Sequence, residues 1–279
     1  MLHEIAPHQY RVEYSTRQPG KGDILLICRK GTILCRAGRE EIEYPTVDQI
    51  KVTRGQYLFS IDDQAFFLPG GLEEPVPEGW ELRSIQTFRT ASPKHLAYAG
   101  WLGSRLALFY AEHRYCGRCG AAAVPSTTER AVVCPSCKAV YYPQISPSVI
   151  VALVDGDRIL LTKYQASHSS YRNYALIAGY NETGETLEET VRREVAEEVG
   201  LQVENITYYK SQPWPLSGAL LAGFFCRLRG SDSVTLETQE LSEARWVSRE
   251  ELESRPDSPS LTGEMIEQFR LGLDPLSQS

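Results

Sequence analysis

The spacing of apolar and polar positions predicts a β-rich region over residues 1–110. Residues 23–36 contain two apolar runs separated by Arg-Lys-Gly, and residues 56–70 repeat this form around Asp-Asp, so each segment predicts a β-hairpin. Residues 92–115 follow a helical pattern with a Ser-Pro pair at the start. No catalytic constellation lies in this region. The sequence leaves open whether it is a scaffold or a dimer surface.

The pattern changes after residue 144, where strands alternate with helices. Residues 147–165 contain two strand-sized apolar runs around Asp-Gly-Asp, which predicts another hairpin. Residues 206–230 predict a strand, a proline-rich loop and a second strand. A short strand is expected over residues 244–248, and a final helix over residues 261–272. This order is typical of a mixed sheet between helices.

The overall composition is that of a soluble globular protein. The chain has 279 residues, of which 42% are hydrophobic and 23% charged. Its net charge of −7 argues against a nucleic-acid-coating role. The first residues lack a signal pattern, and no apolar run approaches the ~20 residues that span a bilayer. We therefore expect a cytoplasmic protein without membrane contact, in which Cys28, Cys35 and Cys226 are reduced core residues.

Two C-x-x-C pairs predict a zinc site, with Cys116 and Cys119 forming one pair and Cys134 and Cys137 the other. Such knuckles can deliver four thiolates tetrahedrally to one Zn²⁺. A redox dithiol is the alternative, but it needs only one C-x-x-C. Four cysteine ligands leave no open position, so this metal would hold the fold and do no chemistry. The nearby basic residues lack clustered aromatic ones, which is more typical of a solvated surface than of a nucleic-acid site.

A glutamate-rich segment, residues 178–201, predicts one short helix with clear ends. Thr186 followed three positions later by Glu189 is a capping box, so the helix is expected to start near Leu187. Gly200 is expected to end it in the left-handed conformation.

Several carboxylates of this helix are expected to face inward. The apolar residues that recur every fourth position from Leu187 to Val199 define the buried face. Glu194 and Glu198 fall on or beside that face, and Glu197 flanks them. Three carboxylates at this spacing repel one another unless a cation joins them. Oxygen ligands without His or Cys suit Mg²⁺ or Mn²⁺. A solvated acidic face with ion pairs is the alternative, which the inward placement disfavours.

The spacing of these residues resembles the Nudix box at every fixed position: Gly179, Glu185, Arg193, Glu194, Val195, Glu197, Glu198, Gly200 and Leu201. Nudix hydrolases cleave a nucleoside diphosphate linked to another group, using divalent metals bound by the box glutamates. The resemblance therefore implies that Glu194, Glu197 and Glu198 bind metal. It also implies that Arg193 and Glu185 orient the loop and the helix.

The chemistry of such a cleavage requires a base as well as metals. A diphosphate diester repels hydroxide unless metals neutralise the phosphates and lower the pKa of a bound water. A further glutamate can accept the proton of that water. Glu240 is one candidate, and a further candidate metal ligand, because the family often has a glutamate just before this strand. Glu198 is the other candidate base, and the sequence does not separate them.

A zinc ribbon ahead of a Nudix domain that carries "SQPWP" (211–215) resembles the NADH pyrophosphatase branch of the family. The resemblance covers roughly residues 95–270. It implies hydrolysis of NAD(H) to nicotinamide mononucleotide and AMP, removal of NAD caps from RNA, and a homodimer with sites near the subunit interface. It also implies the substrate-binding residues, which would be Tyr142, Tyr180, Gln212, Ala219 and Thr262.

The chain departs from this branch on the substrate side. Leu216 replaces an aromatic residue, Ser217 a proline and Ala219 a serine, and Thr262 stands where a small residue would meet the nicotinamide. The box is unchanged, so we expect hydrolysis, while the preferred substrate could be NADPH or ADP-ribose. A ligand-sensing, RNA-binding regulator is a further alternative, although such domains tend to lose box glutamates.

These patterns together predict an α+β protein with three domains. We expect a β-rich N-terminal domain over residues 1–110, a zinc ribbon over residues 111–143, and a Nudix α/β/α sandwich with a mixed sheet over residues 144–279. Neither the choice between Mg²⁺ and Mn²⁺ nor the role of the N-terminal domain follows from the sequence.

Overall fold

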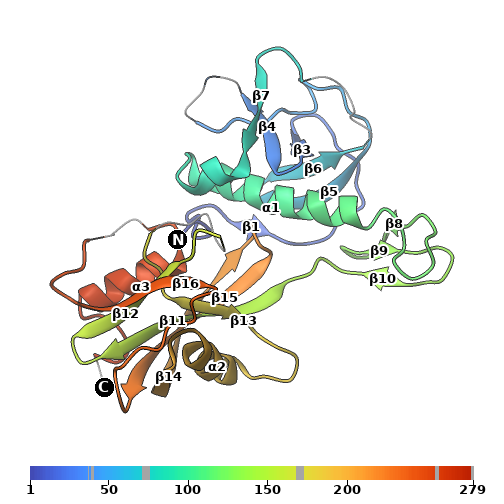
Figure 1. Ribbon diagram of the computed structural model, residues 1–279. Coiled ribbons are helices and arrows are strands. Elements are labelled where there is room, and N and C mark those ends of the chain that lie inside the picture. The colour runs from blue at the N-terminus through green and yellow to red at the C-terminus, as the bar shows by residue number, and fades with distance from the viewer. Residues whose placement is uncertain (37, 39–40, 71–75, 168–172, 255–257, 278–279) are drawn as a thin grey trace. The chain divides into compact units, whose positions relative to one another are not determined.

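The computed structural model divides the chain into two compact units, residues 2–144 and Met1 with residues 145–279. It describes all residues except 37, 39–40, 71–75, 168–172, 255–257 and 278–279 (Figure 1). In the described part of the chain, no helix is both long enough and apolar enough to cross a membrane. The predicted division of residues 1–143 into two domains stays a prediction, because both parts belong to the first unit.

The first unit contains two small β-sheets besides the ribbon. One has the order β1-β5-β6-β2 and consists of Tyr10–Arg11, Gly55–Ile61, Gln64–Pro69 and Ile24–Leu25. The other has the order β3-β4-β7 and consists of Cys28–Arg29, Thr32–Arg36 and Trp80–Ser84.

The two predicted hairpins of the first unit meet different outcomes. The β5–β6 hairpin is confirmed, with Asp62 in the turn at a φ of 53°. The hairpin over residues 23–36 is confirmed only for β3 and β4. Ile24–Leu25 instead pairs in parallel with β6. The apolar run before Arg-Lys-Gly therefore contributes one short strand to each of the two sheets. A local sequence pattern does not reveal this division.

One long helix, α1 (Lys94–Glu112), packs on these sheets after a 3-10 helix, η1 (Ile85–Arg89). The helix begins with Pro93 as N-cap, so the predicted helix is confirmed. Gly100 lets it approach its neighbours closely, since a Cβ there would lie 2.1 Å from the Tyr44 hydroxyl.

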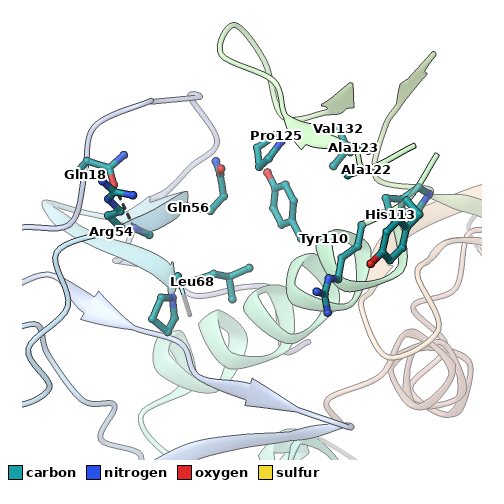
Figure 2. Close-up of a pocket in the computed structure, with 15 residues that line it drawn as sticks. Gln18, Arg54, Gln56, Leu68, Tyr110, His113, Ala122, Ala123, Pro125 and Val132 are labelled. Carbon is teal, nitrogen blue, oxygen red and sulfur yellow. Dashed lines mark hydrogen bonds between the residues drawn. The ribbon is translucent and has the colours of Figure 1, made fainter. Parts of the chain in front are cut away.

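The ribbon consists of β8 (Val124–Pro125), β9 (Val132–Val133) and β10 (Val140–Tyr141), in the order β10-β9-β8. It is attached to the β-rich part by the Arg130 guanidinium, which donates to the carbonyls of Val12 and Leu58. A cavity lies between the ribbon and the end of α1 (Figure 2).

The second unit is built around a six-stranded sheet. Its order is β14-β15-β11-β12-β16, with β13 beside β11. The strands are β11 (Ser146–Asp155), β12 (Arg158–Tyr164), β13 (Ile177–Tyr180), β14 (Gln202–Trp214), β15 (Ala219–Arg229) and β16 (Leu241–Ser248). β11 pairs in parallel with β15 and antiparallel with β12 and β13, so the predicted mixed sheet is confirmed.

Helices α2 (Leu187–Val199) and α3 (Leu261–Arg270) cover opposite faces of this sheet (Figure 1). Alternate residues of β11 explain the two faces. Val149 and Val151 pack in the core with α2, whereas Ile150 and Ala152 pack in the core with α3. The expected α/β/α sandwich is therefore confirmed.

One prediction in this unit was wrong at its boundary. The proline-rich loop predicted within residues 206–230 is shorter than its prolines indicate, because β14 runs through Gln212 and Pro213 to Trp214. β14 is an edge strand, and an edge tolerates proline because a missing N–H there disrupts no ladder on the outer side.

Candidate active site

The second unit contains an acidic cavity of about 1150 Å³. Its lining comes from β11, β12, β13, α2, the start of β15 and the segment before β16. The glutamates that line it are Glu182, Glu194, Glu197, Glu198, Glu237 and Glu240. So many carboxylates around one cavity favour a cationic ligand.

The ends of α2 fix how its side chains point. The Thr186 hydroxyl accepts from the Glu189 amide at 3.2 Å, and the Glu189 carboxylate accepts from the Thr186 amide at 2.7 Å. Gly200 ends the helix with a φ of 69°. The predicted capping box and C-cap are both confirmed, and they set the register that turns two glutamates inward.

The burial of the three glutamates follows the predicted helical faces. Glu194 is 9% exposed and Glu198 3% exposed. The Glu197 side chain is 60% exposed at the cavity edge. Gly179 on β13 makes room for this arrangement, because a Cβ there would lie 1.9 Å from the Glu194 carboxylate.

Arg193 ties the loop before α2 to the helix. Its guanidinium donates to both Glu185 carboxylate oxygens at 2.6 and 3.0 Å, and to the Tyr180 carbonyl at 2.9 Å. It also reaches Glu194 at 2.7 Å and Glu197 at 2.9 Å. The contacts join the loop to the helix, and the orienting role that the resemblance implies for Arg193 and Glu185 stays a prediction.

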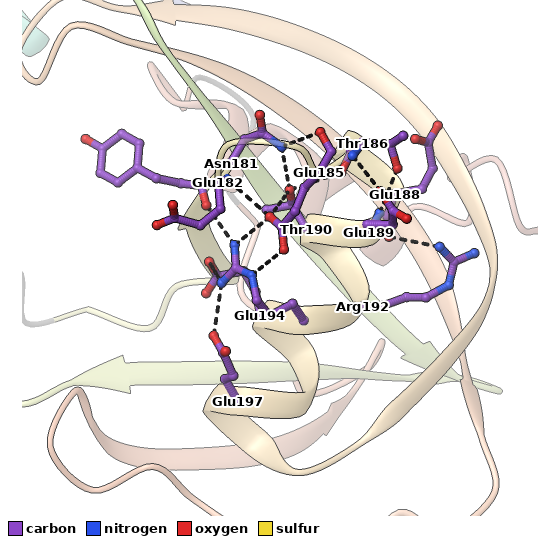
Figure 3. Close-up of polar contacts among 12 residues, drawn as sticks. Asn181, Glu182, Glu185, Thr186, Glu188, Glu189, Thr190, Arg192, Glu194 and Glu197 are labelled. Atoms are coloured by element: carbon purple, nitrogen blue, oxygen red, sulfur yellow. Dashed lines mark hydrogen bonds and ion pairs between the residues drawn. The ribbon is translucent and has the colours of Figure 1, made fainter.

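The loop contributes further polar contacts to this network. Figure 3 shows Asn181, Glu185 and Thr190 joined by hydrogen bonds. The hydrogen bond from Arg193 lowers the pKa of Glu185 to about 2, so this carboxylate stays ionised. Glu185 does not line the cavity, and its carboxylate contacts Arg193 instead.

Glu198 provides the test of whether a cation fits. Its Oε2 is buried and has no hydrogen-bond partner among the described residues. Burial first, and then the charges of Glu194 and Glu240, raise the pKa of Glu198 to about 8. Burial also raises the pKa of Glu194, although Arg193 opposes the shift. A buried, unpartnered carboxylate oxygen among like charges fits a divalent cation, because the cation would supply the missing partner.

The other predicted substrate residues are spread over several places. Tyr180 and Ala219 line the acidic cavity. Gln212 does not line it, since its amide donates to the Pro259 carbonyl at 2.9 Å and accepts from the Leu261 amide at 2.7 Å. Thr262 lies on α3 and does not line this cavity either.

Tyr142 lies in the first unit. Its hydroxyl donates to the Glu129 carboxylate at 3.0 Å. The substrate contacts implied for Tyr142, Gln212 and Thr262 stay predictions.

Sequence reasoning missed four polar residues of the cavity lining, Ser148, Tyr164, Glu182 and Glu237. Glu237 had a signal, because it stands three positions before Glu240 in the same acidic run. Its backbone amide donates to the Glu198 carbonyl at 2.9 Å, which joins this run to α2. Tyr164 had no local signal, because only the pairing of β12 brings it to the cavity.

The four ribbon cysteines converge as predicted. Their sulfur atoms all lie within 4.8 Å of one another, and the Cys116–Cys137 and Cys119–Cys134 pairs are each 3.5 Å apart. Four ligands at ~2.3 Å around Zn²⁺ would be about 3.8 Å apart. The donor set therefore fits a structural zinc ion. The Tyr141 hydroxyl, 3.2 Å from the Cys116 sulfur, lowers the pKa of that thiol to about 6 and favours the thiolate.

Comparisons with known proteins agree with this architecture. Residues 145–269 match the NUDIX domain model, and residues 111–142 match the NADH pyrophosphatase zinc ribbon domain model. The chain therefore carries a NUDIX domain after a zinc ribbon of the NADH pyrophosphatase type, which confirms the predicted resemblance.

Individual relatives are similar over part of their length. The chain is 42% identical over 167 residues to the NAD-capped RNA hydrolase NudC of Escherichia coli O9:H4 (strain HS) and, with the same figures, to that of Shigella boydii serotype 18 (strain CDC 3083-94 / BS512). The match covers 59% of this chain and 63% of each relative, which is less than two thirds of their length. A solved NUDIX hydrolase from Nitrosomonas europaea is 23% identical, with a TM-score of 0.48, over 57% of this chain and 90% of that one.

Proposed function

We propose that the protein hydrolyses the diphosphate bond of NAD(H) to give nicotinamide mononucleotide and AMP, and removes NAD caps from RNA. The observation that carries the proposal is the acidic cavity, where the buried Glu198 has an unpartnered oxygen beside Glu194, Glu197 and Glu240. The type of the zinc ribbon and the name of the curated relatives support NAD(H) and NAD-capped RNA as the substrates.

Glu194, Glu197 and Glu198 would hold Mg²⁺ or Mn²⁺. When bound, such a metal neutralises the diphosphate and acidifies a water molecule. Arg193, which also lines the cavity, holds the Glu194 and Glu197 carboxylates with hydrogen bonds of 2.7 and 2.9 Å. Positioning of this kind matters because the charge of the transition state must meet preorganised groups.

Glu240 is the base that this arrangement favours. A carboxyl group with a pKa of about 8, as in Glu198, is protonated at neutral pH unless a cation displaces the proton. Glu198 therefore suits the role of a metal ligand. Glu240 lines the same cavity and is exposed, so it can accept the proton of the attacking water.

Tyr180 offers a place for a ring of the substrate. It lies at the cavity with 51% of its surface exposed. Stacking of a base or nicotinamide ring on an aromatic side chain contributes ~1–3 kcal/mol. Tyr180 would thus help to select substrates that carry a planar ring.

A second candidate function is hydrolysis of a different substrate, such as NADPH or ADP-ribose. The observation that favours it is the position of Ala219, a buried residue of the cavity lining where a serine was expected. Loss of a hydroxyl at this place removes a hydrogen-bonding group from the substrate side, and a change in preference would follow.

The test is a product analysis with Mg²⁺ or Mn²⁺ and separate samples of NADH, NAD⁺, NADPH, ADP-ribose and a short NAD-capped RNA. Nicotinamide mononucleotide and AMP from NADH, or monophosphorylated RNA from the capped strand, would support the proposal. Cleavage of only NADPH or ADP-ribose would support the second candidate. If none is cleaved with either metal, the enzyme proposal is wrong and a ligand-sensing role becomes the better hypothesis.

We further propose that the protein acts as a cytoplasmic homodimer, as the resemblance implies. Sedimentation of the purified, zinc-loaded chain measures this directly. A mass of one chain across the concentration range would contradict it.

A further inference from the structure

The first unit contains a second cavity, of about 610 Å³, that shares no residue with the acidic one. The end of α1, the outer ends of β5 and β6, and the ribbon enclose it (Figure 2). Its volume lies within the range of small-molecule sites, ~300–1,000 Å³. The proposed hydrolase function uses no part of this cavity.

The side chains that line this cavity are either basic or neutral. Arg54 and Arg114 line it, and no carboxylate does so among the described residues. Within the described chain, neither guanidinium makes a side-chain hydrogen bond or an ion pair. Two free guanidinium groups at one cavity are suited to a phosphate, which they can bind with charge-assisted hydrogen bonds.

Tyr110 presents an unused polar group to the same space. Its hydroxyl is buried and has no hydrogen-bond partner in the part of the chain that the structure describes. Figure 2 shows the Tyr110 side chain extending from the end of α1 toward the ribbon residue Pro125. Buried polar groups are nearly always paired, so an unpaired one that lines a cavity indicates a missing partner. The amide of Gln56, which donates to the Tyr57 carbonyl at 3.2 Å, leaves its oxygen as an acceptor nearby.

Ring surfaces complete the site. Tyr115 lines the cavity and is 64% exposed, and Pro125 and Val132 add an apolar wall from the ribbon. Aromatic faces beside arginines are typical of sites that bind nucleotides, because bases stack on the rings while the phosphate meets the cations. The sequence alone does not reveal this site, because Arg54 is far along the chain from Tyr110 and Tyr115.

We propose that this cavity binds a nucleoside 5′-monophosphate unit, either as a free nucleotide or as part of an RNA chain. Arg54 and Arg114 contact the phosphate, the Tyr110 hydroxyl takes a hydrogen bond from or gives one to the ligand, and the base packs on Tyr115. The apolar and aromatic part of the lining distinguishes such a ligand from a simple inorganic anion.

The first experiment is equilibrium dialysis of labelled AMP against the zinc-loaded full chain without added Mg²⁺ or Mn²⁺. The test variant is Arg54→Gln/Arg114→Gln. The control, Arg11→Gln/Arg118→Gln, removes the same charge from exposed residues outside the cavity. We expect saturable binding by the wild type and the control, and a dissociation constant at least about 100-fold higher in the test variant, about tenfold for each charge-assisted contact. No saturable binding by the wild type, or equal weakening in both variants, would overturn the proposal.

Competitors identify the source of the nucleotide. Inorganic phosphate should displace AMP only at much higher concentration, and displacement at equal concentration would overturn the nucleotide assignment. A 5′-phosphorylated RNA tetranucleotide that competes more strongly than AMP supports an RNA chain, whereas weaker competition supports a free mononucleotide. Because the assay contains no divalent metal and no diphosphate, its outcome does not depend on whether the protein hydrolyses NADH.

Tyr110→Phe isolates the hydroxyl without changing the shape of the side chain. We expect several-fold weaker AMP binding together with an unchanged or raised melting temperature, since the variant loses only an unpaired polar group. Unchanged AMP binding would overturn the contact between this hydroxyl and the ligand.

Discussion

Glu198 gives the site a pH dependence that can be measured without substrate. Its pKa rises from 4.5 to about 8, because of burial first and the neighbouring carboxylates second. The folded state thus binds this proton more tightly than the unfolded chain does. The contribution of this proton to the free energy of unfolding is fully present below pH ~4.5 and is lost as the pH rises through ~8. Without divalent cations, we expect the melting temperature of the wild type to fall relative to Glu198→Gln between about pH 5 and about pH 9.

Added Mg²⁺ or Mn²⁺ should reverse this difference, since the cation stabilises the ionised carboxylate. Glu188→Gln is the control, because Glu188 is an exposed residue of the same helix outside the cavity. Parallel curves for the wild type and Glu198→Gln, with and without cation, would contradict the site assignment. Glu198→Gln should also lower kcat by about 100-fold or more, because metal binding contributes several kcal/mol to the transition state.

Gly179 should tolerate no side chain. A Cβ at this position would lie 1.9 Å from the Glu194 carboxylate and would push it from the cavity. We expect Gly179→Ala to lower kcat by about 100-fold, as for loss of a metal ligand. Gly20→Ala is the control, since the nearest atom to its Cβ is 3.8 Å away. Steady-state kinetics at saturating metal measures the effect, and normal turnover in Gly179→Ala would refute the proposed position of Glu194.

For single residues, the sequence predicts a position in the site where the spacing along one helix determines which way the side chain points. The inward positions of Glu194 and Glu198 follow from helical periodicity alone, and the burial agrees. Residues that reach the cavity only through strand pairing, such as Tyr164, have no comparable signal. The same holds for Gln212, whose amide is occupied by the start of α3. No local pattern reveals that contact.

The capping box of α2 is the element-scale feature that the site depends on most. Thr186 and Glu189 satisfy two backbone amides at the start of the helix. We expect Thr186→Ala to lower the free energy of unfolding by about 1 kcal/mol, a typical cost of losing an N-cap side chain. Urea denaturation measures the change. Thr183→Ala, in the loop outside the box, should change it far less, and equal losses in both variants would exclude a capping effect.

Hairpins and capped helices were predictable because their signals are local. The turn residues and apolar alternation of β5–β6 and β11–β12 lie within a few positions of one another. The parallel pairing of β2 with β6 joins distant segments, so no short pattern contains it. The continuation of β14 through Pro213 also depends on its place at the sheet edge, which appears only when the sheet forms.

At the scale of the whole molecule, each unit has its own core. One cluster of buried residues, which includes Leu25, Leu34 and Phe67, belongs to the first unit. The clusters around α2 and α3 belong to the second unit. The zinc ligands lie in the first unit only. We therefore expect calorimetry to resolve two unfolding transitions, of which removal of zinc shifts only one.

Zinc removal tests this separation. A chelator under denaturing conditions should release about one ion per chain, because four thiolates bind one zinc. Under native conditions, the same treatment should lower the melting temperature of the first unit, since metal binding to the folded state contributes directly to its stability. Cys134→Ser should reproduce the shift, and Cys226→Ser, which alters a buried thiol of the other core, should instead lower the second transition. A single transition that moves as a whole in every sample would show that the two cores unfold together.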